Sequence, residues 1–410
     1  MHIVFLCHYF PPEVNAPASR TCENARHWVK QGNQVTVITC VPNHPGGRVY
    51  PGYKNRFWQW DEKDGIRVLR VKTFIGPNKG VVKRIANYVS YMISAALLCH
   101  LVKKADVVIS TSPQFFCGLA GYFVSRRLKC PWMLEIRDLW PESIIAVGAI
   151  RQRHIIRLLE GIESFMYKNA DHIICLTHAF KRHIMKRGIA EERLSIITNG
   201  ADLDQFSPIP ESKNQVKKQY GLDNKFVVSF IGTHGMAHGL DTVLEAAERL
   251  KDEKNILFLL VGDGAERQRL VQEKGKRGLG NILMVGQQEK RLMPHFISAS
   301  DACMVLLRKS ELFKTVIPSK IFEAMAMERP IIHGVEGESK EIIEAGKCGL
   351  CIEPENDEQL ADAVLELYNN REVCRQLAEN GKSYVKAKFN RRDLADKYLR
   401  GIYEVAGREM

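Results

Sequence analysis

Residues 317–332 read IPSKIFEAMAMERPII and show the alternation of apolar runs and helical patterns that is found throughout the chain. Apolar runs flank a Pro-Ser pair and a helical pattern, so the sequence predicts a short helix between two strands. Lys320 and Glu323 fall in the first turn of that helix. Capping explains them only in part. Ser319 can serve as N-cap and the helix dipole favours an early acid, but a capping box needs its acid at Phe322.

The same alternation of short apolar runs and helical patterns continues along the chain. The runs are uniformly apolar, which indicates strands covered on both faces by helices, as in parallel sheets. The predicted strands are residues 2–7, 34–40, 66–73, 105–110, 131–136, 171–176, 193–200, 225–232, 255–264, 281–286, 301–307 and 330–335. Strands that alternate with helices predict an α/β protein with two Rossmann-like, doubly wound domains.

The boundary between the domains is predicted within 199–215, where Pro, Asp and Ser cluster and the apolar periodicity stops. We therefore predict an N-terminal domain over 1–205 and a C-terminal domain over 206–385. The polar stretch 355–381 is predicted to be helical, and residues 386–410 to form a last helix that packs back on the N-terminal domain. Ligands bind at the carboxyl ends of strands in open α/β sheets, so two such domains predict a cleft between those ends.

The charge balance predicts an anionic partner. Lys and Arg number 59 against 47 Asp and Glu, which gives a formal net charge of +12. Such a partner can be a nucleic acid, a phosphorylated small molecule or an anionic membrane surface. The 11 cysteines are scattered through apolar segments, as reduced thiols are in cytosolic proteins. The first apolar run is too short for a signal peptide, so we expect a cytoplasmic protein.

One segment, residues 85–102, carries no charged side chain but has cations on both sides. These flanking cations are Lys79, Lys83, Arg84, Lys103 and Lys104. Its length approaches the roughly 20 residues that span a bilayer, but the polar side chains within it make a span unfavourable. Two alternatives remain. The segment is either a helix buried on one side, or a helix that places the region 79–104 on an anionic membrane surface.

A glycine-rich loop follows the predicted strand 225–232. Its glycines allow close approach of the backbone to a ligand, and the helix that follows offers unpaired amides. The glycines and polar residues of this loop are Gly232, Thr233, His234, Gly235, His238 and Gly239. The pattern favours a loop that binds a phosphate group of a ligand. The alternative is a connecting loop whose glycines only allow the chain to turn. A second loop, VGDGAE, is more simply explained as a tight turn.

The stretch EIRDLWPES, residues 135–143, places charged side chains directly after another predicted strand. Arg137 and Asp138 would lie at the carboxyl edge of the sheet, where they can bind hydroxyls or orient a reacting group. The alternative is a surface salt bridge with Trp140 packed beneath it. A rigid loop, PNHPGG, follows an earlier strand. The sequence contains no pattern typical of a zinc site or a hydrolase elbow.

Taken in order, these motifs resemble the retaining family 4 glycosyltransferases, which have the GT-B fold of two Rossmann-like domains facing a central cleft. The matching motifs are YFPPEV, WVKQGNQVTVIT, ADHIICLT, IITNGADLDQF, IGTHGMAHGLDTVLEAAERL, LLVGDGAE and SKIFEAMAMERPII. The resemblance covers the chain from residue 1 to about residue 390. YFPPEV, PNHPGG, YPGYK, RDLWPES and PSKIFE most resemble the WbuB-type L-fucosamine transferases of O-antigen and capsule assembly.

The resemblance implies a donor site in the C-terminal half. Glu323 would accept hydrogen bonds from the ribose hydroxyls of a nucleotide, and Lys320 would lie toward its diphosphate. The other donor-binding residues would be Gly232, Thr233, His234, Gly235, His238, Thr315 and Ser319. Members of this fold usually need no metal, so we expect neither a metal nor another cofactor.

Several positions depart from the family pattern. Thr315 stands where the family has a glutamate that contacts the donor sugar. Thr233 and His238 stand where it has the phosphate-binding Arg and Lys, and Asn15 and Ala16 replace a glycine pair in the first loop. These departures leave the donor sugar open and admit a changed activity.

For the N-terminal domain we expect Arg137 and Asp138 to act in catalysis by positioning the reacting sugar. The acceptor-binding residues are expected to be Asn15, Arg20, His44 and Glu142. In the family's front-side mechanism the leaving phosphate helps remove the acceptor proton, so the resemblance implies no dedicated enzyme base.

The resemblance thus predicts an enzyme, a hexosyltransferase-type glycosyltransferase that retains anomeric configuration. Its donor would be a nucleotide-diphosphate sugar, UDP-linked, and the closest resemblance suggests N-acetyl-L-fucosamine. Its acceptor would be a polyprenyl-diphosphate-linked saccharide of lipopolysaccharide O-antigen or capsule, which places the protein peripherally on the inner face of the membrane.

Two other functions remain as alternatives. One is a nucleotide-sugar 2-epimerase of the same fold, and the other is a non-catalytic basic protein that binds membrane or RNA. The sequence shows no aromatic-basic array of the kind that binds RNA on a sheet face, so we expect no nucleic-acid partner.

Overall fold

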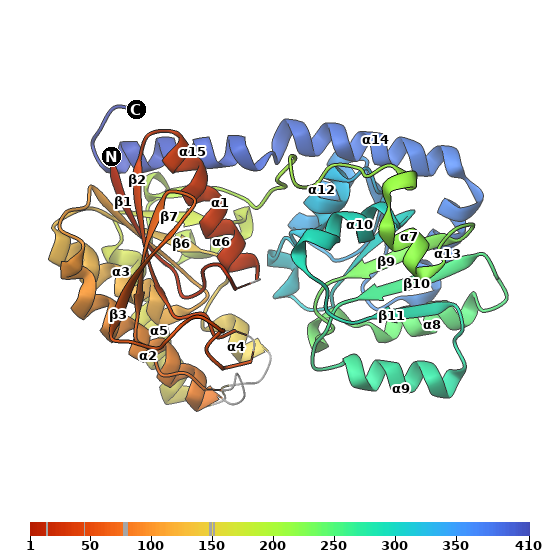
Figure 1. Ribbon diagram of the computed structural model, residues 1–410, viewed down its shortest axis with the longest axis horizontal. Coiled ribbons are helices and arrows are strands. Elements are labelled where there is room, and N and C mark those ends of the chain that lie inside the picture. The colour runs from red at the N-terminus through yellow and green to blue at the C-terminus, as the bar shows by residue number, and fades with distance from the viewer. Residues whose placement is uncertain (14, 45, 77–80, 147–149, 151) are drawn as a thin grey trace. The chain divides into compact units, whose positions relative to one another are not determined.

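The structure is a computed structural model of the chain, and Figure 1 shows its elements. It describes residues 1–410 except 14, 45, 77–80, 147–149 and 151. The predictions that involve Val14 in YFPPEV, Pro45 in PNHPGG and the flanking cation Lys79 lie outside the described residues.

The chain divides into two compact units. Unit 1 comprises Met1–Thr198 together with Arg392–Met410, and unit 2 comprises Asn199–Arg391. The crossings between the units therefore fall a few residues away from the domain limits that the sequence predicts at 205 and 386.

Unit 1 is built on an eight-stranded sheet with the order β3-β4-β2-β1-β5-β6-β7-β8. Neighbouring strands are parallel except β3 and β4, which pair antiparallel. The strands are β1 (His2–Leu6), β2 (Gln34–Cys40), β3 (Trp58–Lys63), β4 (Ile66–Val71), β5 (Val107–Thr111), β6 (Trp132–Ile136), β7 (His172–Cys175) and β8 (Leu194–Ile196). The strand order reverses between β1 and β5, so ligands are expected at the carboxyl ends of these strands.

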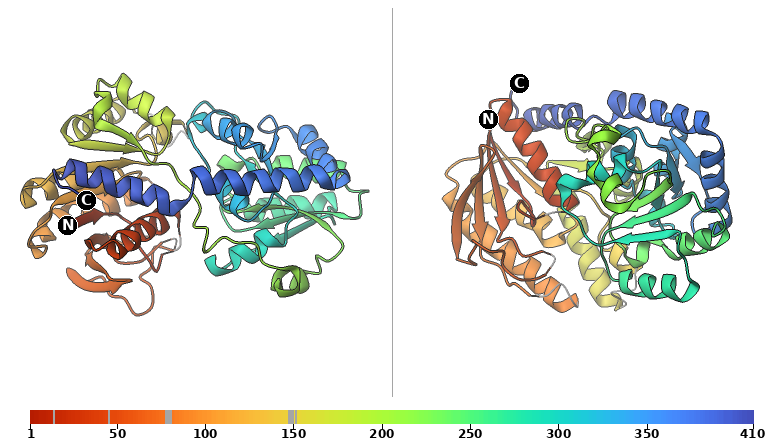
Figure 2. Two further views of the ribbon diagram at one scale, coloured as in Figure 1. Left: turned by 90° about the horizontal axis from the view of Figure 1, so that it is seen from above. Right: turned by 45° about the vertical axis from the view of Figure 1, so that its right-hand side comes forward.

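Helices cover both faces of this sheet. Helices α1 and α15 lie side by side on one face (Figure 2), where the rings of Trp28 and Tyr398 meet edge to face at 5.2 Å. Helices α2, α3, α5 and α6 share a second apolar core on the other face. The helical elements are α1 (Ala16–Lys30), α2 (Val81–Leu98), η1 (Cys99–Leu101), α3 (Phe115–Leu128), α4 (Glu142–Ala146), α5 (Arg153–Asn169), α6 (His178–Lys186), η2 (Glu191–Arg193) and α15 (Arg391–Val405).

Unit 2 is built on a six-stranded parallel sheet with the order β11-β10-β9-β12-β13-β14. Its strands are β9 (Phe226–Ile231), β10 (Ile256–Val261), β11 (Ile282–Val285), β12 (Ala302–Leu306), β13 (Ile331–Gly334) and β14 (Gly349–Cys351). The order reverses between β9 and β12, which again marks the carboxyl ends of the central strands as the expected ligand edge.

The helices of unit 2 also form two layers. Helices α8, α9 and α13 pack with one face of the sheet, and α7, α10, α11, α12 and α14 with the other. The helical elements are η3 (Glu211–Lys213), α7 (Gln215–Tyr220), η4 (Met236–His238), α8 (Asp241–Arg249), α9 (Arg267–Arg277), η5 (Lys290–Leu292), α10 (Met293–Ser298), η6 (Phe313–Thr315), α11 (Lys320–Ala326), α12 (Glu338–Gly346), α13 (Asp357–Asn369) and α14 (Arg371–Lys388). Two doubly wound α/β units therefore confirm the predicted fold class.

Each predicted strand coincides with an observed one, because uninterrupted apolar runs are buried on both faces of a sheet. Two observed strands were not predicted. Strand β3, with the sequence WQWDEK, lies at the edge of its sheet and is only partly buried, so it lacks the continuous apolar signal. Strand β14 has only three residues.

The C-terminal helices also differ from prediction. The stretch 355–381 belongs to two helices, because Asn370 ends α13 and its side chain accepts a hydrogen bond from the backbone amide of Val373 in α14. Helix α14 continues to Lys388, so the last helix begins at Arg391 and not at residue 386.

The uncharged segment 85–102 forms most of α2 and the short η1. Tyr91 and Ala95 are buried against the sheet, and the Tyr91 hydroxyl donates to the Ile38 carbonyl at 2.7 Å, which confirms a helix buried on one side. Ile93 and Leu97 are exposed on the opposite side. Among the described residues, no helix has the length and apolar character required to cross a membrane.

Gly121 of α3 provides a test of how closely the helices pack on the first sheet. A Cβ at this position would lie 2.2 Å from Ser110 Oγ and 2.3 Å from Trp132 Nε1, two atoms joined by a 2.8 Å hydrogen bond. Gly121→Ala should therefore lower the free energy of unfolding of unit 1 by about 1–3 kcal/mol in a denaturant titration.

Gly161→Ala in α5 is the matched control, because no atom lies within 4 Å of the added Cβ. This exposed helical site should gain up to about 1 kcal/mol from the lower backbone entropy of alanine in the unfolded chain. Equal destabilisation by both substitutions would contradict the packing described here.

Candidate functional site

Two loops of unit 2 lie back to back at the carboxyl ends of β9 and β10. The His234 amide donates to the Asp263 carbonyl at 2.9 Å. A Cβ on Gly262 would lie 1.9 Å from the Gly232 carbonyl oxygen, and one on Gly264 would lie 2.4 Å from that of His234. Both glycines are therefore needed for this contact, a role that the interpretation of VGDGAE as a plain turn did not include.

Lys320 occupies the space that the absent side chain of Gly232 leaves open. Its Nζ lies 3.8 Å from the centroid of the Phe230 ring, and a Cβ on Gly232 would lie 2.4 Å from the same nitrogen. Burial lowers the pKa of Lys320 to about 8, although the nearby Glu323 carboxylate acts in the opposite direction. The structure thus holds an ammonium group with reduced hydration beside the glycine loop.

Lys320 and Glu323 line one cavity, because a spacing of three residues places them on one side of α11. The cavity walls also come from β9 and β12, through side chains that include Ser229, Ile231 and Val305. Ser319 is the N-cap residue of α11, as predicted, but its side chain makes no capping hydrogen bond.

The two histidines of the glycine loop are neutral near pH 7. Burial, then Arg267 and Lys320, lower the pKa of His234 to about 4. Burial and then Lys320 lower the pKa of His238 to about 4 as well. Both ring nitrogens of the buried His234 lack a hydrogen-bond partner among the described residues. Buried polar atoms are normally paired, so a bound ligand is a natural partner for this ring.

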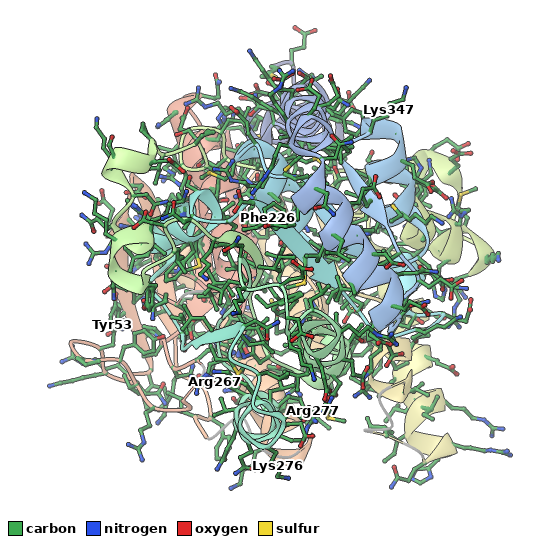
Figure 3. All side chains as sticks on the ribbon, turned by 90° about the vertical axis from the view of Figure 1, so that its right-hand side faces the viewer. Tyr53, Phe226, Arg267, Lys276, Arg277 and Lys347 are labelled. Atoms are coloured by element: carbon green, nitrogen blue, oxygen red, sulfur yellow. The ribbon has the colours of Figure 1, made fainter. Side chains whose placement is uncertain are left out.

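Arg267 is a residue of this region that the sequence interpretation missed. It is the first residue of α9 and follows the second glycine loop (labelled in Figure 3). It is close enough to His234 to lower the pKa of that ring. Its Nε is buried and has no hydrogen-bond partner among the described residues. The only signal in the sequence was a cation at the start of a helix after G-D-G.

Other predicted donor residues lie in the same unit. Thr233 is exposed on the glycine loop, and the ring of His238 contacts the carbonyl of Gly235 through Nδ1 at 3.3 Å. The Thr315 hydroxyl donates to the Leu312 carbonyl at 2.7 Å, so it stabilises the turn before α11. Glycine is required at Gly337, where φ is +78° and a Cβ would lie 2.1 Å from the Lys314 carbonyl oxygen.

In unit 1, Arg137 and Asp138 follow β6 directly. Burial lowers the pKa of Arg137 to about 10, and its Nε and Nη1 have no hydrogen-bond partner among the described residues. Its nearest acid is Glu135, with Nε 3.9 Å from Oε1. Burial raises the pKa of Asp138 to about 6, against the effect of Ser143 and the Leu139 amide.

Arg20, predicted to bind the acceptor, is engaged within the protein. Its guanidinium lies 3.3 Å from Glu135 Oε2 and donates at 3.0 Å to the carbonyls of Ile197 and Thr198. Those carbonyls end unit 1, so Arg20 positions the chain where it leaves this unit. Glu135 thus lies beside two guanidiniums, those of Arg20 and Arg137, at the end of β6.

Of the other predicted acceptor residues, the Asn15 side chain also has an internal hydrogen-bond partner, whereas the buried Nδ1 of the His44 ring has none among the described residues. The Asn15 side chain caps α1 by accepting from the Ala18 amide at 2.9 Å. The His44 amide donates to Glu13 Oε1 at 2.9 Å, while its half-buried ring packs on Tyr9 with centroids 5.0 Å apart. Both side chains lie near the carboxyl edge of the first sheet, since they follow β1 and β2 in the chain.

Glu142 belongs to a paired cluster. Burial raises its pKa, but His183 at 3.3 Å and Arg187 at 2.7 Å outweigh that effect and bring the pKa down to about 2. Ligand atoms of Glu142, Glu163 and His183 lie within 4.8 Å of one another, as metal ligands do. The Arg187 guanidinium pairs with both carboxylates, however, and burial raises the pKa of Glu163 to about 7, so the cluster carries little net negative charge near pH 7 and we assign it a structural role.

Comparison with known sequences agrees with this geometry. Residues 15–200 match the family model of the glycosyl transferase 4-like domain, and residues 212–384 match that of the glycosyl transferases group 1. The alpha-D-kanosaminyltransferase of Streptomyces kanamyceticus is 30% identical over 302 residues, which cover 70% of this chain and 73% of that protein. WcaI of Escherichia coli strain K12, named as a glycosyl transferase of colanic acid biosynthesis, is 24% identical over 90% of this chain and 93% of its own.

Solved structures show the same fold. Sucrose-phosphate synthase from Thermosynechococcus elongatus aligns with a TM-score of 0.77 at 16% identity, over 99% of both chains. HepE from Anabaena, solved in complex with UDP and glucose, aligns with a TM-score of 0.73 at 16% identity, over 98% of both chains.

The two doubly wound units and these matches define an enzyme of the GT-B class, a glycosyltransferase. More particularly, the chain belongs to the family 4 glycosyltransferases, whose two halves the 4-like and group 1 models describe. This membership excludes a purely non-catalytic protein and favours transfer over 2-epimerisation.

The contact between Gly232 and Lys320 can be tested by a double-mutant cycle. Gly232→Ala should displace the Lys320 ammonium and weaken UDP binding by about tenfold or more, the loss expected for one charged hydrogen bond. In a Lys320→Ala background the same change should cost less, because the displaced group is already absent, and the remaining loss measures the strain of alanine at a φ of +147°. Isothermal titration calorimetry measures each affinity.

Gly235→Ala is the matched control for protein stability. Its φ is −110° and the added Cβ would meet only ordinary contacts, the nearest at 3.6 Å, so its melting temperature should equal that of the wild type. Additive effects of the Gly232 and Lys320 substitutions on UDP affinity would show that the two sites are independent, contrary to this account.

Proposed function

We propose that the protein is a retaining glycosyltransferase that takes a sugar from a UDP-linked donor bound in unit 2. The observation that carries this proposal is the position of Lys320 and Glu323 at the start of α11, where both line a small cavity beside the glycine loop. A carboxylate is a strong acceptor for the vicinal hydroxyls of ribose, and an ammonium is a suitable partner for diphosphate. HepE from Anabaena, which has the same fold and was solved in complex with UDP and glucose and with UDP-glucose, supports a nucleotide-sugar donor.

The proposed diphosphate site compensates for the missing family cations. Thr233 and His238 supply no positive charge near pH 7, so Lys320 and Arg267 would carry the charge that the leaving group requires. His234 would add a hydrogen bond from a ring that has no internal partner. Groups held in place before the reaction stabilise the developing charge most effectively.

In the proposed reaction the bond from the anomeric carbon to the diphosphate oxygen breaks, and a new bond forms from that carbon to the acceptor oxygen on the same face. The acceptor proton passes to the leaving diphosphate. This route needs no resident metal and no dedicated enzyme base, so we propose that the enzyme uses neither. Arg137, with its unpaired N–H groups, and Asp138 would position the reacting sugars from unit 1.

For the acceptor we propose a polyprenyl-diphosphate-linked saccharide of surface polysaccharide assembly, such as O-antigen or capsule. The names of two relatives support this, one for colanic acid biosynthesis and one for O-antigen chain mannosylation. The buried N–H groups of Arg137 that have no hydrogen-bond partner among the described residues would suit a phosphorylated acceptor. We further propose that the transferred sugar is N-acetyl-L-fucosamine, because the motifs resemble those of WbuB-type enzymes. We also propose that the region 79–104 contacts the membrane.

A thermal-shift panel tests the donor assignment. UDP-, GDP- and dTDP-sugars are each added to the wild type and to Glu323→Ala, and a ligand that binds only the folded state raises the melting temperature. We expect the largest rise with UDP-sugars. Loss of the ribose acceptor in Glu323→Ala should weaken that binding by roughly tenfold or more. An equal rise in the variant would overturn the assignment of Glu323 to the ribose.

The pKa of Lys320 predicts a pH dependence. This pKa is about 8 in the free protein, and a bound diphosphate should raise it toward the ordinary 10.5. UDP then binds the protonated form more tightly, so its affinity should fall by roughly five- to tenfold between pH 7.5 and pH 9. Calorimetry at pH 9 in two buffers of different ionisation enthalpy should detect proton uptake.

Lys320→Met is the reference for this pH series, because it removes the titrating group while the nucleotide's own ionisation stays the same. Subtracting its pH profile from that of the wild type isolates Lys320. Identical profiles in the two proteins would show that Lys320 does not sense the diphosphate.

A further inference from the structure

Six of the ten exposed large apolar side chains among the described residues of unit 1 lie on helices that cover one face of its sheet, and the other four are Phe57, Trp58, Phe74 and Met410. On the outer sides of α2, α3, α5 and α6 the exposed ones are Ile93, Leu97, Phe123, Leu158, Phe165 and Met185. Leu97 is 67% exposed and Leu158 is 64% exposed. Across the sheet, the described residues of α1 and α15 expose no large apolar side chain.

The exposed charges on the same four helices are of one sign. Lys83 and Arg84 lie near the start of α2, and Arg126 and Arg127 lie in the last turn of α3. All four side chains are exposed. Cations also follow η1, at residues 103 and 104.

Helices α5 and α6 continue this pattern. Arg153, Arg157 and Lys168 are exposed on α5, and exposed cations also occur on α6. The acids of α2, α3, α5 and α6 are Glu160, which is partly buried, and Glu163, which is buried. By contrast, α15 on the opposite face exposes Asp393 and Glu404 among its cations.

These helices form a continuous layer. Their inner sides share one apolar core, and α2 contacts α3, which in turn contacts α5. Figure 1 shows α2, α3 and α5 in the same part of the unit. The rings of Tyr122 on α3 and Phe165 on α5 lie 4.9 Å apart, so these two helices adjoin, and His183 of α6 lies 4.0 Å from Glu163 of α5.

We infer that the outer sides of α2, α3, α5 and α6, here called the basic helical face, lie together on an anionic lipid bilayer. This inference rests on the proposed lipid-linked acceptor and extends the membrane contact from the 79–104 region to three further helices. Cations attract anionic headgroups within a Debye length, and isolated aliphatic or aromatic side chains enter the interface.

The chemistry of the face selects this partner over others. A second copy of the chain would bring two positively charged faces together, which is unfavourable. Nucleic acid would satisfy the cations, but it offers no apolar environment to Leu97 or Leu158. An anionic bilayer supplies both a negative surface and an apolar interior.

Charge reversal on α5 tests the inference, because α2 stays intact. Arg153→Glu with Arg157→Glu should weaken binding of the full chain to vesicles of phosphatidylcholine and phosphatidylglycerol by more than about tenfold in a flotation assay. Lys397→Glu with Arg400→Glu on α15 makes the same change in net charge on the opposite face, and it should alter binding by less than about twofold. Leu158→Ser alone should weaken vesicle binding with an unchanged melting temperature.

Three results would overturn the inference: wild-type vesicle binding by the α5 variant, equal losses in the α5 and α15 variants, or binding to an RNA oligonucleotide without binding to anionic vesicles. The rise in melting temperature with UDP-sugar is measured in the same proteins. If UDP-sugar did not raise the melting temperature of the wild type, the proposed donor would be overturned. The vesicle assay would still show whether the basic helical face binds an anionic bilayer.

Discussion

The donor half depends on one contact, the Lys320 ammonium resting against the Phe230 ring in the space above Gly232. A side chain at residue 232 would exclude the ammonium, and an apolar surrounding without Glu323 nearby would lower its pKa further. The contact holds a cation at the carboxyl ends of the central strands, where a doubly wound sheet receives its ligand. It would supply positive charge to the proposed diphosphate in a chain that has Thr233 and His238 in place of the family's cations.

The position of that cation depends in turn on the backbone beneath it. Gly262 and Gly264 allow the second loop to contact the carbonyls of Gly232 and His234, and this contact supports the backbone of the glycine loop. Arg267 begins the helix that follows the second loop. The two loops are thus packed directly against each other. Charged groups that are held in place before the reaction are the ones that stabilise a leaving diphosphate.

The fold could be predicted from the sequence because parallel strands buried on both faces leave uninterrupted apolar runs, whereas the edge strand β3 and the short β14 leave no such signal. Lys320 and Glu323 could be paired because helix geometry relates residues three apart. The partners of Arg20 and Glu142 could not be predicted. Arg20 contacts residues 135, 197 and 198, and Glu142 contacts residue 187, so only the tertiary fold brings them together. Arg267 and Gly262 were missed for the same reason.

A crystal structure of the full chain with UDP would test the central claim most directly. The account predicts ribose hydroxyls at hydrogen-bond distance, about 2.5–3.0 Å, from the Glu323 carboxylate, with the diphosphate beside Lys320 Nζ and the His234 ring. UDP bound at another place in the chain, or a ribose without contact to Glu323, would contradict it.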